Sequence, residues 1–271
     1  MKRFFAFSLF SAVLLSLFSV TARTATPSVS AKHAVLLDAV GGDFLWEKDA
    51  DTRVPMASTT KIATAIAVLE ALPLEKTVTV PKEAVGVEGT SAYLTEGERL
   101  TVRDLLHALL LASANDAAIT LAIACDGSVA AFSARMNRLA DELSLKNTRF
   151  ENPHGLPADA HYTTARELAL LSAYAMHNPA FTEIVAKKHY TCQTSTQTRA
   201  FRNHNKLLSF SADAVGIKTG FTKASGRCLV GAANRDGALL ISVTLSAPND
   251  WNDHISLWNY GFSLLGLSEK Q

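Results

Sequence analysis

A serine three residues before a lysine, at the head of a long apolar run, is the feature that most constrains this sequence. Ser58 and Lys61 precede a segment whose apolar residues recur at i, i+3, i+4 and i+7 from Ile62. This period predicts a helix that is apolar nearly all round, is therefore buried, and ends before Pro73. Because residues three apart share a helix face, the side chains of Ser58 and Lys61 are predicted to touch.

Such a pair has the chemistry of a nucleophile and its base. A serine hydroxyl is a weak nucleophile until a neighbouring base removes its proton. A lysine can be that base when burial lowers its pKa, and the apolar helix would bury Lys61. Taken alone, the spacing is more typical of a helix cap with a solvated lysine, because many helices contain it by chance.

Two further motifs change that interpretation. Ser113 and Asn115 lie at the break between two helical patterns, and Lys218 begins a Lys-Thr-Gly sequence on a predicted strand. Each has an ordinary alternative, a cap at a helix junction and an exposed strand end. Their joint presence, in this order after Ser58, favours one shared site.

The three motifs resemble those of the low-molecular-weight D-alanyl-D-alanine carboxypeptidases, serine penicillin-binding proteins related to class A β-lactamases. The resemblance covers residues 31–267, and within them the segments 94–118, 150–156, 161–179 and 216–225. It implies a DD-peptidase fold and removal of the terminal D-alanine from peptidoglycan stem peptides. It also implies that no cofactor is needed and that β-lactam antibiotics acylate the enzyme.

The resemblance gives the catalytic residues their roles. Ser58 is expected to attack the substrate carbonyl and Lys61 to receive its proton. Ser113 is expected to pass a proton to the leaving amine, and Asn115 to hydrogen-bond Lys61 or the substrate amide. One oxyanion-hole N–H is expected from Ser58 itself.

The Lys-Thr-Gly motif is expected to bind substrate. Lys218 and Thr219 would bind the substrate carboxylate, and Gly220 would leave room for a peptide along the strand edge. The backbone N–H of Phe221 would complete the oxyanion hole. Many relatives also have an arginine after the final strand, but residues 248–256 contain none. Arg199 or Arg202 is the alternative carboxylate ligand.

Strand patterns occur at both ends of the chain, and helix patterns lie between them. A Gly-Gly turn joins the predicted strands 33–38 and 43–46, and further strands are predicted at 189–192, 216–221, 228–234 and 239–246. A terminal helix is predicted over 251–267. The expected fold is α+β, an antiparallel sheet flanked by helices, as one catalytic domain over 26–271 with a mainly helical lobe inserted at about 99–186.

Residues 1–22 have the pattern of an export signal, two basic residues followed by an apolar run, with cleavage expected between 22 and 25. The protein is therefore expected in the periplasm or outside the cell. Without another long apolar stretch, no stable membrane anchor is expected after cleavage; the alternative is that the signal stays attached as an anchor. The net charge of +1 and the absence of a basic run argue against nucleic acid as a partner.

The remaining reactive side chains do not suggest a second chemistry. Cys125, Cys192 and Cys228 are an odd number and form no metal-binding spacing. Buried free thiols are favoured over a bond between Cys192 and Cys228, which lie on strands expected to be neighbours. The eight histidines contain no zinc-protease pattern, so no metal site is predicted, and His154 is expected to hold a loop by hydrogen bonds.

Two alternative functions remain at this stage. A β-lactamase or related amidohydrolase would share the acylation step but needs a glutamate that activates water. Glu151 is the only glutamate in the comparable region, and a loop-capping role is favoured for it. A catalytically silent penicillin-binding scaffold is the second alternative, although the complete motif set argues against it. Trp251, Trp258 and Phe262 are predicted to lie in the core.

Overall fold

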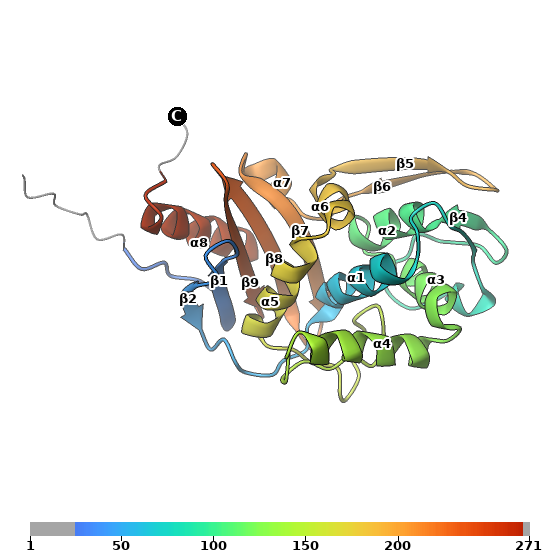
Figure 1. Ribbon diagram of the computed structural model, residues 1–271, viewed down its shortest axis with the longest axis horizontal. Helices are drawn as coiled ribbons and strands as arrows, with labels where there is room; N and C mark the ends of the chain where they lie inside the picture. Colours follow the sequence, from blue (N-terminus) through green and yellow to red (C-terminus); the bar gives the residue numbers. More distant parts are fainter. Residues whose placement is uncertain (1–24, 268–271) are drawn as a thin grey trace, which may run out of the picture.

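The computed structural model describes residues 25–267 and is built around a five-stranded antiparallel sheet. The strand order is β2-β1-β9-β8-β7 (Figure 1). The strands are β1 (His33–Asp38), β2 (Phe44–Lys48), β7 (Ala214–Thr222), β8 (Gly226–Arg235) and β9 (Ala238–Leu245). The predicted α+β fold, with a sheet formed from both ends of the chain, is confirmed.

Helices cover both faces of the sheet and extend beyond its β7 edge (Figure 1). The helix α8 packs on one face, and α5 packs on the other, against β1 and β9. The helices are α1 (Lys61–Ala71), α2 (Val102–Leu110), α3 (Asn115–Asp126), α4 (Val129–Glu142), α5 (Ala165–Met176), α6 (Pro179–Ala186), α7 (Leu207–Phe210) and α8 (Asp250–Leu264). Two short 3-10 turns are η1 (Ala57–Thr60) and η2 (Lys82–Ala84).

The alternation of side chains along each strand divides the core into two layers. Leu240 on β9 packs with Trp258 and Phe262 of α8. Its neighbours Ile241 and Val243 belong to the larger cluster that the sheet shares with α1 to α6. The buried positions of Trp258 and Phe262 confirm their prediction as core residues.

Two short hairpin-like pairs lie outside the main sheet. β3 (Thr77–Thr79) pairs with β4 (Arg99–Thr101), and β5 (His189–Gln193) pairs with β6 (Thr198–Arg202). The expectation that Cys192 and Cys228 lie on neighbouring strands was wrong, because β5 and β8 belong to different sheets. All three cysteines are free, and Cys192 and Cys228 are buried as the favoured interpretation predicted, but Cys125 is only half-buried.

A capping box of Thr101 and Asp104 opens α2 with both reciprocal hydrogen bonds. Leu72 takes an extended conformation after α1, as the residue before a proline is expected to do. The predicted export signal at residues 1–22 lies outside the described residues, and the boundaries of the inserted lobe stay a prediction.

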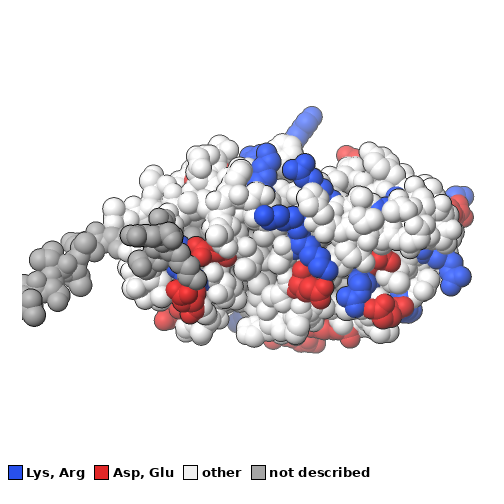
Figure 2. All heavy atoms as spheres, turned by 90° about the horizontal axis from the view of Figure 1, so that it is seen from above, with Lys and Arg blue, Asp and Glu red and all other residues white. Residues whose placement is uncertain are grey.

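Among residues 25–267, no single helix combines the length and hydropathy needed to cross a bilayer. α3 and α4 meet that test only when they are joined across an 84° bend. On the face seen in Figure 2, acidic and basic side chains are interspersed and most of the surface is uncharged.

Candidate active site

The 3-10 turn η1 brings the predicted nucleophile and base together. Side chains three apart eclipse one another in a 3-10 helix, more closely than in an α-helix. Ser58 lies in η1 and Lys61 begins α1, and the distance between Lys61 Nζ and Ser58 Oγ is 3.0 Å. The predicted contact is present, although Ser58 lies in this turn rather than in the α-helix itself.

Side-chain hydrogen bonds hold the turn in an unusual backbone conformation. Ala57 has a φ of 48°, which is uncommon for a residue with a Cβ. Thr59 Oγ1 donates to the Met56 carbonyl oxygen at 2.6 Å, and Thr60 Oγ1 donates to the Ala57 carbonyl oxygen at 2.8 Å. The hydroxyls of the two residues after Ser58 therefore hold the carbonyl groups of the two residues before it.

Lys61 Nζ is surrounded by three hydrogen-bond acceptors. Its Nζ donates to Asn115 Oδ1 and to the His154 carbonyl oxygen, both at 2.7 Å. Nζ also donates to Ser58 Oγ at 3.0 Å, so one of its three acceptors is the predicted nucleophile. Burial, followed by the positive charge of Lys218, holds the pKa of Lys61 well below its usual value, and Asp116 opposes the shift only in part.

The second motif joins α2 to α3. Ser113 is buried, with a φ of 61°, between the two helices, and Asn115 is the first residue of α3. Asn115 Nδ2 donates to the Glu88 carbonyl oxygen at 2.6 Å, and this bond directs Oδ1 toward Lys61. A helix-junction cap was the alternative role for this motif, but the side chain of Asn115 binds Lys61.

The third motif lies on β7, the last strand in the sheet order. Lys218 is buried and its Nζ donates to the Thr219 carbonyl oxygen at 2.9 Å; burial lowers its pKa to about 7. Gly220 also faces the nucleophile turn, and the room that it was expected to leave for a peptide stays a prediction. A Cβ there would lie 3.0 Å from Ser58 N and 3.1 Å from the Cβ of Ala57, so glycine permits close packing against the nucleophile turn.

These residues line one open cavity of about 280 Å³. The predicted site residues Ser58, Ser113, Thr219, Gly220 and Phe221 all contribute to its wall. Three further site residues, Lys61, Asn115 and Lys218, are buried behind that wall. Lys61 contacts both Ser58 and Asn115, and Lys218 contacts the carbonyl oxygen of Thr219. The side chain of Phe221 is 67% exposed at the cavity rim.

Other contributors to the site were missed. The His154 carbonyl oxygen is invisible to motif analysis because it is a backbone group, although the predicted loop-holding role of His154 fits its Nδ1, which accepts from Leu156 N at 3.2 Å. Arg227 and Asp250 also line the cavity. Trp251 was predicted to be in the core but is half-buried and lines the same cavity, because it lies at the start of α8 beside β8.

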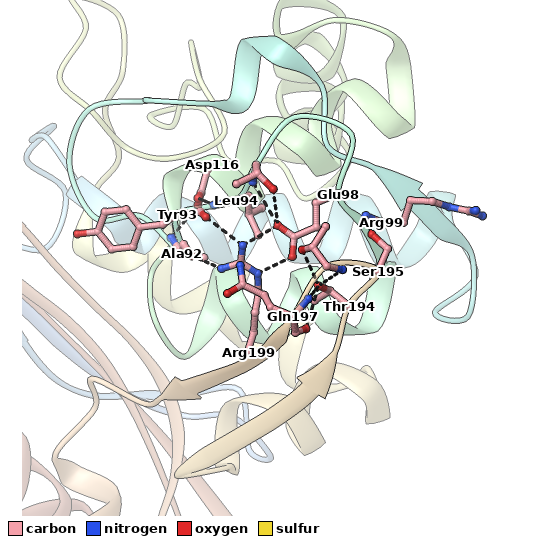
Figure 3. A network of polar contacts seen from close by, with 12 residues as sticks. Ala92, Tyr93, Leu94, Glu98, Arg99, Asp116, Thr194, Ser195, Gln197 and Arg199 are labelled. Atoms are coloured by element: carbon pink, nitrogen blue, oxygen red, sulfur yellow. Dashed lines mark hydrogen bonds and ion pairs between the residues drawn. The ribbon is translucent and has the colours of Figure 1, made fainter.

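Arg199 was wrong as a candidate carboxylate ligand. It forms a buried ion pair with Glu98, from Nη2 at 2.6 Å and Nε at 2.7 Å (Figure 3). Its Nη1 donates to the Ala92 carbonyl oxygen and its Nη2 also to that of Tyr93. These contacts tie β6 to the loop between η2 and β4 and use four of the five N–H donors of the guanidinium. Arg202 lines two neighbouring cavities and not the one that contains Ser58.

No group of three or more histidine, cysteine, aspartate or glutamate side chains among residues 25–267 has an arrangement that could hold a metal ion. Burial lowers the pKa of His154 to about 3 and that of His161 to about 4, so both are neutral near pH 7. Glu151 Oε2 accepts from Ala160 N at 3.2 Å, which agrees with the loop-capping role favoured for this residue.

A family model described as D-alanyl-D-alanine carboxypeptidase matches residues 20–249. The chain belongs to this family of serine-type enzymes. A D-alanyl-D-alanine carboxypeptidase from Streptomyces sp. (strain K15) is 38% identical over 88% of this chain and 89% of its own length. D-alanyl-D-alanine carboxypeptidase DacF of Bacillus subtilis is 31% identical over 89% of this chain, which spans 64% of that protein.

Solved structures of this fold agree. The crystal structure of the Streptomyces K15 DD-transpeptidase has a TM-score of 0.85 with 35% identity, and the alignment covers 89% of this chain and all of that chain. A penicillin-binding protein homologue from Mycobacterium tuberculosis also has a TM-score of 0.85, with 30% identity over 92% of this chain and 97% of the other. The predicted family resemblance is confirmed.

Proposed function

We propose that this chain is an exported serine DD-carboxypeptidase that removes the terminal D-alanine from peptidoglycan stem peptides through an acyl-enzyme on Ser58. The 3.0 Å contact between Ser58 Oγ and the buried Nζ of Lys61 carries the proposal. Family membership supports the reaction class, and the open cavity beside Ser58 offers space for a peptide.

Acylation begins with transfer of the Ser58 proton to the neutral Nζ of Lys61. Ser58 Oγ then bonds to the carbonyl carbon of the penultimate D-alanine, and the carbonyl oxygen becomes an oxyanion. The backbone N–H groups of Ser58 and Phe221 stabilise it. This pairing is supported by the packing of Gly220, the residue before Phe221, against Ser58 N.

Collapse of the tetrahedral intermediate breaks the peptide bond. The leaving nitrogen of D-alanine takes the proton that Lys61 received, by way of the Ser113 hydroxyl, and the shortened peptide remains as an ester on Ser58. A water molecule then attacks the ester, with Lys61 again accepting the proton. Hydrolysis restores the Ser58 hydroxyl and releases the peptide as an acid.

The outer edge of β7 provides the mode of peptide binding. Among the described residues, β7 pairs only with β8 in the main sheet, so an extended peptide can add to its other edge. Thr219 contributes a hydroxyl at the cavity wall, and Lys218 lies directly behind it. Penicillins would occupy the same place and acylate Ser58.

The β-lactamase alternative has less support. The residues around the Ser58 cavity do not include Glu151, whose carboxylate instead binds the backbone of its own loop. A water-activating glutamate must face the ester bond, so slow hydrolysis of a penicillin adduct is expected. The scaffold alternative is opposed by the intact contacts among Ser58, Lys61 and Asn115.

Release of D-alanine from a synthetic peptide ending in D-Ala-D-Ala tests the proposal. We expect stoichiometric D-alanine and a peptide shortened by one residue, without added metal or cofactor. A parallel reaction with an added amine acceptor separates hydrolysis from transpeptidation, which transfers the peptide to the amine. No D-alanine release in either reaction would refute the proposed function. Cleavage of residues 1–22 and periplasmic or extracellular recovery would test export.

A further inference from the structure

A partly exposed guanidinium faces the cavity that contains Ser58. Arg227 on β8 lines this cavity with Thr219 of β7, and its side chain is 43% exposed. In the antiparallel register, Arg227 pairs with Phe221 and Leu229 pairs with Thr219. Paired residues share a face and alternate along the strand, so Arg227 and Thr219 are diagonal neighbours on one face of the sheet.

The guanidinium is held in place from one side. Arg227 Nε and Nη2 both donate to Asp250 Oδ1, at 3.0 Å and 2.8 Å. Asp250 is 2% exposed, and its Oδ1 also accepts from Trp251 N at 3.0 Å. The Trp251 ring centre lies 5.5 Å from Arg227 Cζ. These contacts orient the guanidinium through Nε and Nη2, while Arg227 lines the cavity that contains Ser58.

We propose that Arg227, together with the hydroxyl of Thr219, binds the C-terminal carboxylate of the substrate. The inference rests on the proposed function. A peptide with its scissile carbonyl at Ser58 ends one residue later, so its carboxylate must lie within the same cavity. A guanidinium there gives charge-assisted hydrogen bonds whose geometry suits a carboxylate.

Arg199 and Lys218, two other cations proposed for the carboxylate, are less well placed than Arg227. Residues 248–256 contain no arginine, and Arg199 is held in a buried ion pair with Glu98 and does not line this cavity. Lys218 is buried behind the wall, and its pKa of about 7 leaves it only partly charged at neutral pH. Arg227 presents a planar guanidinium, whose N–H donors match both oxygens of a carboxylate. Asp250 balances the charge of the guanidinium before substrate binds.

The test compares two peptides that differ only at the C-terminus, one with a free carboxylate after D-Ala-D-Ala and one with an amide. For Arg227→Gln, we expect kcat/KM on the carboxylate peptide to fall about 10- to 100-fold, the usual effect of losing a charge-assisted hydrogen bond. The amide peptide should lose less than about threefold by the same argument. Arg227→Lys should fall between wild type and Arg227→Gln.

Arg235→Gln is the matched control, because Arg235 also lies on β8 and pairs with an aspartate, Asp213, at 2.7 Å beside a different cavity. It should leave the carboxylate-to-amide preference unchanged. Equal losses of Arg227→Gln on both peptides, or no loss at all, would overturn the inference while leaving the proposed function intact.

A second measurement does not depend on peptide turnover. The rate of Ser58 acylation by benzylpenicillin is compared with that by its methyl ester, by intact mass. Arg227→Gln should slow the free acid about 10- to 100-fold and leave the ester nearly unchanged. Suppose that wild type releases no D-alanine, but Arg227→Gln slows acylation by the free acid and not by the ester. The proposed function would then be refuted, and the inference about Arg227 would be retained. Equal slowing of acid and ester would refute the inference.

Discussion

Gly155 packs against Ala57 so closely that a Cβ on Gly155 would lie 1.9 Å from the Ala57 carbonyl oxygen. The φ of Gly155 is +92°, which also favours glycine. The residue before it, His154, supplies the carbonyl oxygen that binds Lys61 Nζ. The loop that orients the base and the turn that carries Ser58 are therefore packed backbone to backbone.

Gly155→Ala should separate these two segments. We expect kcat/KM to fall about 100-fold or more, because a displacement of about 1 Å at a catalytic group has effects of that size. Gly42→Ala is the control, since Gly42 has a φ of +82° and a Cβ there would meet no atom within 4 Å beyond its chain neighbours. It should cost only about 1–2 kcal/mol of stability, for a left-handed residue with a Cβ. Steady-state kinetics and thermal unfolding of both variants test this prediction. Equal kcat/KM values for Gly155→Ala and Gly42→Ala would contradict it.

The buried pair of Glu98 and Arg199 gives a prediction about stability. Burial alone would raise the pKa of Glu98, but hydrogen bonds from Arg199, Thr194 and Thr95 lower it to about 2. Arg199→Leu leaves this carboxylate buried and unpaired, which should destabilise the protein by about 3–5 kcal/mol at pH 7. The double variant with Glu98→Leu should recover part of that loss.

The sign of the pH effect follows from the lowered pKa of Glu98. Its contribution to stability is fully present above the unfolded value of 4.5 and is lost as the pH falls toward 2. The free energy of unfolding of wild type should therefore fall relative to that of the double variant as the pH falls from about 5 to about 3. Urea unfolding at several pH values measures it; parallel curves would show that Glu98 keeps an ordinary pKa.

Lys218 predicts a pH effect of the same sign in a higher pH window. Burial lowers its pKa from 10.5 to about 7, so between these values the folded protein binds fewer protons than the unfolded chain. Wild-type stability should accordingly rise with pH across this window, relative to Lys218→Met. The same variant removes a positive charge near Lys61, so the pKa of Lys61 should rise. The pH below which the acylation rate declines should therefore move to a higher value. An unchanged value would show that the two lysines are not coupled.

Glu151 separates the peptidase from the β-lactamase. Because its carboxylate caps a loop, the penicillin adduct should persist for minutes or longer in wild type and in Glu151→Gln alike. Intact mass spectrometry after removal of excess penicillin follows the adduct. Rapid penicillin turnover that is lost in Glu151→Gln would favour the β-lactamase.

Local patterns predicted much of this site, because its chemistry is encoded at short spacing. The period of residues after Lys61 indicated the nucleophile helix, and the Gly-Gly turn and the strand patterns indicated the sheet. The position of Ser113 between two helices also followed from a break in the pattern. These features depend on contacts between residues near one another in sequence.

The features that the sequence could not predict depend on the register of strand pairing and on how closely two backbone segments approach each other. β6 was missed because its residues 198–202 include two arginines, and only the structure shows that Arg199 is buried against Glu98. The place of Arg227 beside Thr219 depends on the pairing of β7 with β8. The reason for Gly220 required the distance between a strand and the nucleophile turn.

The central claim is that Ser58 becomes acylated with Lys61 as its base, and the mass of the protein after reaction with penicillin tests it most directly. We expect wild type to gain one penicillin mass, mapped by peptide digestion to Ser58, and Ser58→Ala to gain none while keeping its fold. Lys61→Ala should acylate about 10²–10⁴-fold more slowly. A penicillin adduct on Ser58→Ala, or acylation of Lys61→Ala at the wild-type rate, would contradict the account.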